Sequence, residues 1–208
     1  IYASASTNVT NTFNNQIFNN NCASSSGGMY GYYNFAFCNN ENVYDNQIYS
    51  NTGGTGEAIM IYARSGSAPT NKDIYNNTIY NISAAPTASQ VGAIWVDYAT
   101  IGKVYKNNIY NITNTAASGA APAVFGLTAG AQVNVQVSFY NNTISELKAP
   151  NMSNVNAIYG IWLQGSTSSN LRAYYNTVHM NATSVGANFG TAGIVCTTTP
   201  TNIDLRNN

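Results

Sequence analysis

The feature that most constrains this fold is an asparagine that returns at nearly regular intervals along the whole chain. Successive copies are separated by 31, 31, 30, 35, 34 and 32 residues. They are Asn15, Asn46, Asn77, Asn107, Asn142, Asn176 and Asn208. Around each one the chain repeats a pattern of apolar residue, aromatic residue, any residue, Asn, any residue, and Ile or Val. Self-similarity with such a period predicts a solenoid of stacked repeats.

Each repeat reads as strands rather than helices. The Asn motif is rich in Ile, Val, Tyr and Thr in short alternating runs, which is typical of β-structure. A second apolar run lies between successive motifs, at 58–61, 93–96, 123–126, 160–163 and 193–196. The repeats differ in length within segments rich in Gly, Ser, Ala, Pro and Asn, and this composition indicates loops. We therefore expect one all-β domain over residues 1–208, a right-handed parallel β-helix of about six and a half coils of 30–35 residues.

The repeated Asn has two expected uses. A tight corner between strands favours a residue that tolerates a left-handed backbone, and Asn does so better than most. Stacked side-chain amides can also hydrogen-bond from coil to coil, as a ladder. Residues three before the Asn, such as Ile74, and two after it, such as Ile79 and Ile109, are then expected to point inward as core.

These motifs resemble the right-handed parallel β-helix repeats of the pectin-lyase-like superfamily, in which Asn ladders and Asn-x-Ile corners recur. The resemblance covers nearly the whole chain and concerns its architecture. It implies an extracellular or cell-surface protein, of the kind found among secreted bacterial surface proteins and adhesins. The superfamily also holds polysaccharide lyases, glycoside hydrolases and phage tailspikes, and the fold alone does not choose among them.

The low charge narrows the possible partners. Charged residues make up 7% of the chain, with seven basic and seven acidic side chains, so no strong field attracts nucleic acid. No apolar run is long enough to span a membrane. Three cysteines do not form a disulfide framework, although Cys22 and Cys38 could pair, and Cys196 reads as a small buried hydrophobe. We expect neither a metal site nor a cofactor, because the single His and the scattered Cys show no ligand spacing.

The charged residues give no sign of a catalytic centre. When they are aligned on the repeat, no two acids share a column on adjacent coils, so no glycosidase pair is visible. Asp73 shares a column with Lys103, and Arg172 shares one with Asp204, which predicts surface ion pairs. His179 falls in a column that holds aromatic residues in earlier coils, and we interpret it as an outward side chain.

Aromatic residues are the unusual outward feature. One column, two residues before the Asn, contains Tyr44, Tyr75, Tyr105, Tyr140 and Tyr174. Strict alternation in the second run predicts another column of Met60, Trp95, Phe125, Trp162 and Val195. The candidate ligand-binding residues are therefore Trp95, Asp97, Phe125, Trp162 and Gln164. The other interpretation is that these rings stack on one another or lie under loops, for stability.

The sequence thus favours a non-catalytic extracellular module that acts as a stalk, an adhesin, or a surface that binds a glycan or another protein chain. The alternative is a polysaccharide lyase or glycoside hydrolase whose catalytic residues lie outside this piece. Because both ends interrupt the repeat without polar caps, we expect the chain to be part of a longer array or to stack end to end. Threonines are scattered in the loops, which disfavours an ice-binding array.

Overall fold

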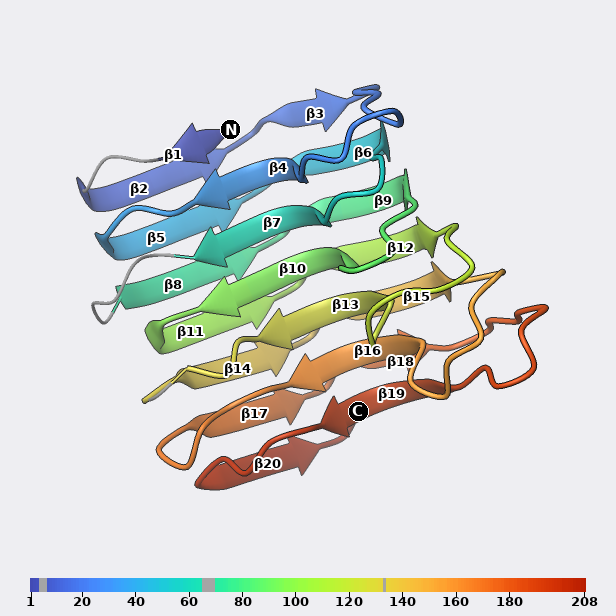
Figure 1. Ribbon diagram of the computed structural model, residues 1–208. Coiled ribbons are helices and arrows are strands. Elements are labelled where there is room, and N and C mark those ends of the chain that lie inside the picture. Colours follow the sequence, from blue (N-terminus) through green and yellow to red (C-terminus); the bar gives the residue numbers. More distant parts are fainter. Residues whose placement is uncertain (4–6, 65–69, 133) are drawn as a thin grey trace.

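The computed structural model, which describes residues 1–3, 7–64, 70–132 and 134–208, is a parallel β-helix of about six turns. Each turn contributes a strand to each of three parallel sheets, so the coils rise one above the other (Figure 1). The described residues contain strands, turns and bends, and they include no helix that could cross a membrane. The predicted fold class is confirmed.

The three sheets run the length of the solenoid. The first sheet consists of β1 (Tyr2–Ala3), β4 (Met29–Asn34), β7 (Ala58–Arg64), β10 (Val91–Asp97), β13 (Val124–Ala129), β16 (Ile158–Leu163) and β19 (Thr191–Cys196). The second consists of β2 (Thr7–Phe13), β5 (Cys38–Tyr44), β8 (Thr70–Tyr75), β11 (Ala99–Tyr105), β14 (Gln136–Tyr140), β17 (Asn170–Tyr174) and β20 (Asn202–Arg206). The third consists of β3 (Gln16–Phe18), β6 (Gln47–Thr52), β9 (Thr78–Ala84), β12 (Asn108–Asn114), β15 (Thr143–Lys148) and β18 (Thr177–His179).

The repeated Asn forms the predicted ladder at the corner between the second and third sheets. The Asn77 amide nitrogen donates to the Asn107 side-chain oxygen and to the Val43 carbonyl, both at 2.9 Å. The Asn77 side-chain oxygen in turn accepts from the backbone and side-chain nitrogens of Asn46, at 3.1 and 2.9 Å. Asn77 is fully buried, so these bonds satisfy polar groups that water cannot reach.

The left-handed residue of this corner is not the ladder Asn, contrary to the sequence-based expectation. It is the residue immediately before, with φ between 50° and 55° in every coil. These residues are Asn14, Asp45, Asn76, Lys106, Asn141, Tyr175 and Asn207. The two positions therefore have different roles. The preceding residue turns the chain, and the Asn side chain is left free to hydrogen-bond along the axis.

The core consists of stacked apolar rows. Ile74, Ile79 and Ile109 are fully buried, as predicted, and each lies beside its counterpart in the neighbouring coils. Parallel pairing places such counterparts one strand spacing apart, roughly 4.8 Å. The rows therefore pack as continuous columns inside the solenoid.

The first three coils place polar groups in the same interior. Glu41 and Lys72 are both fully buried, and their Oε2 and Nζ atoms lie 2.9 Å apart. The Tyr32 hydroxyl donates to the other Glu41 oxygen at 2.8 Å, and Lys72 also donates to the Ala63 carbonyl at 2.6 Å. Burial, followed by the Glu41 charge, raises the pKa of Tyr32 well above its ordinary value, so this hydroxyl stays protonated. No pattern in the sequence predicted this network.

One expectation about cysteine is wrong, and the possible pairing of Cys22 with Cys38 does not occur. Cys22 and Cys38 are free thiols, and Cys38 is buried beside the Thr10 hydroxyl at 3.3 Å. Cys196 is exposed rather than buried, although it pairs with the inward-facing Leu163. The reason is that β19 is the outermost strand of the first sheet among the described residues, so one side of Cys196 is open there.

Candidate functional site: the outer face of the first sheet

Strands of the first sheet depart from simple alternation. In β7, Met60 and Ile61 both face the core, while Ile59 and Tyr62 both face outward. Outward side chains are therefore three residues apart instead of two. In β13 the first of the two inward positions is Gly126, where a Cβ would lie 2.6 Å from the Gly160 carbonyl oxygen and 2.8 Å from Ile144. The backbone here approaches the core too closely for most side chains.

The two consecutive inward residues change the predicted outward column. The pairing of the strands defines two outer rows in place of one. The first, the Tyr30 row, consists of Tyr30, Ile59, Gly92, Phe125, Tyr159 and Ala192. The second, the Trp95 row, consists of Tyr33, Tyr62, Trp95, Thr128, Trp162 and Val195. Trp95 and Trp162 share a row as predicted, but Phe125 lies in the other row and Met60 lies in the core.

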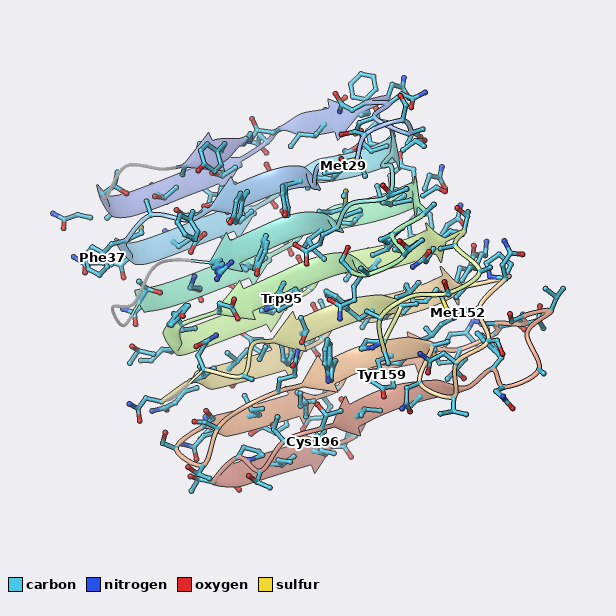
Figure 2. All side chains as sticks on the ribbon, viewed as in Figure 1. Met29, Phe37, Trp95, Met152, Tyr159 and Cys196 are labelled. Atoms are coloured by element: carbon cyan, nitrogen blue, oxygen red, sulfur yellow. The ribbon has the colours of Figure 1, made fainter. Side chains whose placement is uncertain are left out.

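Rings from the two rows pack against each other. Trp95 stacks on Tyr62 at 5.0 Å between centroids and meets Phe125 nearly at right angles, at 5.7 Å. The Phe125 ring occupies the space above Gly92, where any side chain would overlap it. Phe125 is fully buried and Trp162 is 8% exposed, whereas Trp95 is only half-buried. Figure 2 shows Trp95 and Tyr159 on strands of this sheet, on the side facing the viewer.

The polar candidates bond within the protein. The Trp95 indole nitrogen donates to Asp97 Oδ1 at 2.9 Å, and Gln164 donates to the Thr128 hydroxyl at 3.2 Å. Asp97 is buried, and burial raises its pKa despite the hydrogen bond from Trp95 and the nearby positive charges of Lys72 and Arg64. Asp97 and Gln164 therefore hold neighbouring side chains in position.

The accessible part of this face lies around Arg64, on coils that the sequence-based candidates mostly missed. The Arg64 guanidinium carbon lies 5.4 Å from the Phe35 ring centroid and 5.9 Å from that of Tyr62, both cation–π distances. Its side chain is 40% exposed, and its Nε is 4.0 Å from Asp97. We call Tyr33, Phe35, Tyr62, Arg64, Trp95 and Asp97 the Arg64 patch. Its signal in the sequence was the alternation that resumes after two consecutive inward residues, so that Tyr62 and Arg64 align with Trp95 and Asp97.

Tyr30 and Glu57 adjoin this patch along the same face. The Tyr30 hydroxyl donates to Glu57 at 3.0 Å. Burial is the main cause that raises the pKa of Glu57, and the charge of Asp97 adds to it, while Tyr30 and Arg64 oppose it. Two carboxyl groups on this face thus have raised pKa values.

The tyrosine column beside the Asn corner is a second outer aromatic feature. Neighbouring rings from Phe13 to Tyr140 stack nearly parallel, with centroids 4.8 to 5.0 Å apart. A matching stack runs from Phe18 to Tyr110 on the third sheet. Because each ring face is covered by the next ring, only the ring edges and hydroxyls of the inner members face solvent. His179 continues the second stack's row beyond Ser145 and is exposed, as expected.

Two of the charged columns predicted from the sequence lie at the surface. Lys103 lies 4.0 Å from Asp73, as the shared column predicted. Asp204 pairs in register with Arg172, but its ion-pair partner is Arg206 at 2.7 Å. In the part of the chain that the structure describes, no three His, Cys, Asp or Glu side chains gather in a way that could hold a metal ion.

Comparison with known proteins gives no family: no family model, no curated protein and no solved structure matches the chain. The class that the fold defines, a parallel β-helix with an Asn ladder, therefore rests on the geometry alone.

Proposed function

We propose that this chain is a non-catalytic β-helical module of an extracellular or cell-surface protein, and that it serves as a rigid stalk or adhesin segment. The observation that carries the proposal is the continuity of its ladders. The Asn column joins every pair of adjacent coils by hydrogen bonds, and the aromatic stacks follow it along much of the outside. The Asn and aromatic side chains of these columns hold adjacent coils together. The resemblance to secreted surface proteins of the pectin-lyase-like superfamily supports the location.

The alternative, a polysaccharide lyase or glycoside hydrolase, is tested directly by enzyme assay. Incubation of the intact protein with plant and bacterial polysaccharides should release neither reducing ends nor unsaturated products. Appearance of either product, lost in Asp97→Asn or Glu57→Gln, would place the chain among the enzymes. These two residues are the informative ones because they are the carboxyl groups of the outer face with raised pKa values.

A binding role for the Arg64 patch is the second candidate, and the partial exposure of Arg64 and Trp95 favours it. Binding sites for sugars and peptides combine aromatic walls with a few placed polar groups. At this patch the half-buried ring of Trp95 could contact an apolar sugar face. The Arg64 guanidinium, held beside two rings, could donate to hydroxyl or carboxyl oxygens. The ligand would be a glycan or a segment of a partner chain.

Tryptophan fluorescence tests this role, because one of the two indoles is half-buried in the patch and the other is nearly covered. In a Trp162→Phe variant, Trp95 is the only indole, so titration with a ligand of the patch should change the remaining emission. Arg64→Gln should weaken that response at least about tenfold, which corresponds to the loss of one charge-assisted hydrogen bond. Lys103→Gln, on another face, is the matched control. A panel of glycans and adhesion partners that leaves the emission unchanged would show that the patch is structural.

A further inference from the structure

The pair of Lys72 and Glu41 is the most unusual chemical feature of the interior. A primary amine and a carboxyl group are held 2.9 Å apart, and both side chains are fully buried. Glu41 lies on β5 and Lys72 on β8, in register on adjacent coils and 31 residues apart in sequence. In the described residues, Lys72 is the only fully buried basic side chain.

We propose that Lys72 and Glu41 form an intramolecular amide, a covalent cross-link between the second and third coils. The ammonium group of Lys72 first gives a proton to Oε2 of Glu41, and the neutral nitrogen then attacks the carboxyl carbon, forming an N–C bond. The C–O bond to one carboxyl oxygen then breaks. The ammonium group and the carboxylate together become an amide and one water molecule, so atoms and charge balance without an oxidant or an activating co-substrate.

Geometry favours the attack. Two groups that are held in contact react with effective molarities far above any solution concentration, about 10⁵ M or more in well-oriented cases. The terminal torsion of a Glu side chain has a broad energy minimum, so a small rotation of the carboxyl plane can present the face of the carboxyl carbon to the nitrogen. The Ala63 carbonyl accepts a hydrogen bond from the amine at 2.6 Å and fixes its position.

Tyr32 stabilises the negative charge that develops on Glu41 during the attack. Its hydroxyl donates to Glu41 Oε1 at 2.8 Å, while Lys72 donates to Oε2 at 2.9 Å. The nitrogen of Lys72 passes two protons to Oε2, one before the attack and one after it, so Oε2 leaves as water and Oε1 becomes the amide oxygen. Tyr32 keeps its proton and holds the charge on Oε1 in the tetrahedral intermediate.

Burial favours the product. Two charges in an apolar interior each carry a large desolvation cost, which their attraction offsets only in part. The amide is neutral, so forming it removes both charges from the core. The buried position also keeps bulk water away from the new bond.

Mass spectrometry of the folded chain tests the link. The intact protein should be lighter than its sequence by one water molecule. After denaturation, trypsin should fail to cleave after Lys72, so that peptide 1–64 stays joined to peptide 65–103 as one branched species. Lys103, which only meets Asp73 at the surface, should remain free and cleavable. A folded protein with the full sequence mass, cut by trypsin after Lys72, would overturn the proposal.

Variants separate the chemistry from a folding defect. Glu41→Leu with Lys72→Met replaces the pair by apolar side chains of similar size, and its mass should match its sequence. Tyr32→Phe keeps the ring and removes the hydrogen bond to Oε1, so unlinked protein should persist at least about a hundredfold longer after refolding, the range expected when one donor to a developing oxyanion is lost. If Tyr32→Phe links as fast as the parent, Tyr32 does not stabilise the intermediate. If the Glu41→Leu/Lys72→Met protein still lacks one water, the link lies elsewhere and the assignment is wrong.

Discussion

The first three coils and the later coils stack on the same rows but fill them with different chemistry. The row that holds Glu41 and Lys72 in the early coils continues as Gly102, Val137 and Leu171. On the third sheet, Asn51 forms a second, short ladder with Asn20, and the same row then continues through apolar residues. Those residues are Ile82, Ile112 and Leu147.

This difference separates what the fold requires from what the early coils add. The later coils show that apolar rows and the Asn corner are sufficient for stacking. The polar interior of the early coils adds specificity, because a one-residue shift of β8 against β5 would turn Lys72 away from Glu41. A mismatched register there would leave buried charges unpaired, which is far more costly than a misplaced methyl group.

The largest expected effect comes from removing one partner of the polar interior. Lys72→Met leaves Glu41 buried without its partner, whether the two are paired or linked, and should lower the unfolding free energy by roughly 3–5 kcal/mol. Chemical denaturation measures it. Adding Glu41→Leu to this variant should recover part of the loss. If Lys72→Met lowers the unfolding free energy by less than its surface counterpart Lys103→Met does, the proposed difference between the early and the later coils is wrong.

The next effect belongs to the apolar rows. Ile109→Ala should destabilise the protein by roughly 2–5 kcal/mol, because Ile109 is fully buried in a close-packed column. Ile17 occupies the same row in the first coil and is only half-buried, so Ile17→Ala should cost clearly less. Equal losses in urea denaturation would contradict the idea that neighbouring coils on both sides supply the stability of each row.

The pH dependence of the unfolding free energy is predicted from Asp97 and Glu57. Burial raises the pKa of both in the folded state, so between their ordinary range, about pH 4, and their raised values the folded protein binds more protons than the unfolded chain. The unfolding free energy should therefore fall as the pH rises through that window. Thermal melts across the window should show this slope, and Asp97→Asn, which keeps an acceptor for Trp95, should flatten it. An unchanged slope in the variant would assign the dependence to other groups.

The solenoid and its ladder could be predicted because both depend on a linear period, which a single sequence displays. The outer face of the first sheet could not, because two consecutive inward residues, such as Met60 and Ile61, break the alternation on which the prediction rested. The buried network was missed for another reason. Charged residues are usually exposed, and nothing local distinguishes Lys72 from Lys103 until the coils are stacked.

The smallest effect is expected for the pair that lies next to the buried one. Lys72 and Asp73 are adjacent on β8, so they point to opposite faces of the sheet, one into the core and the other to solvent. Asp73 meets Lys103 at 4.0 Å, with side chains 39% and 50% exposed, and such pairs contribute about 0–1 kcal/mol. Asp73→Asn should therefore change the unfolding free energy by less than about 1 kcal/mol, and added salt should shrink even that difference. Denaturation of the variant at low and high salt measures both quantities. A loss as large as that of Lys72→Met would mean that the outer row of the second sheet is covered rather than exposed.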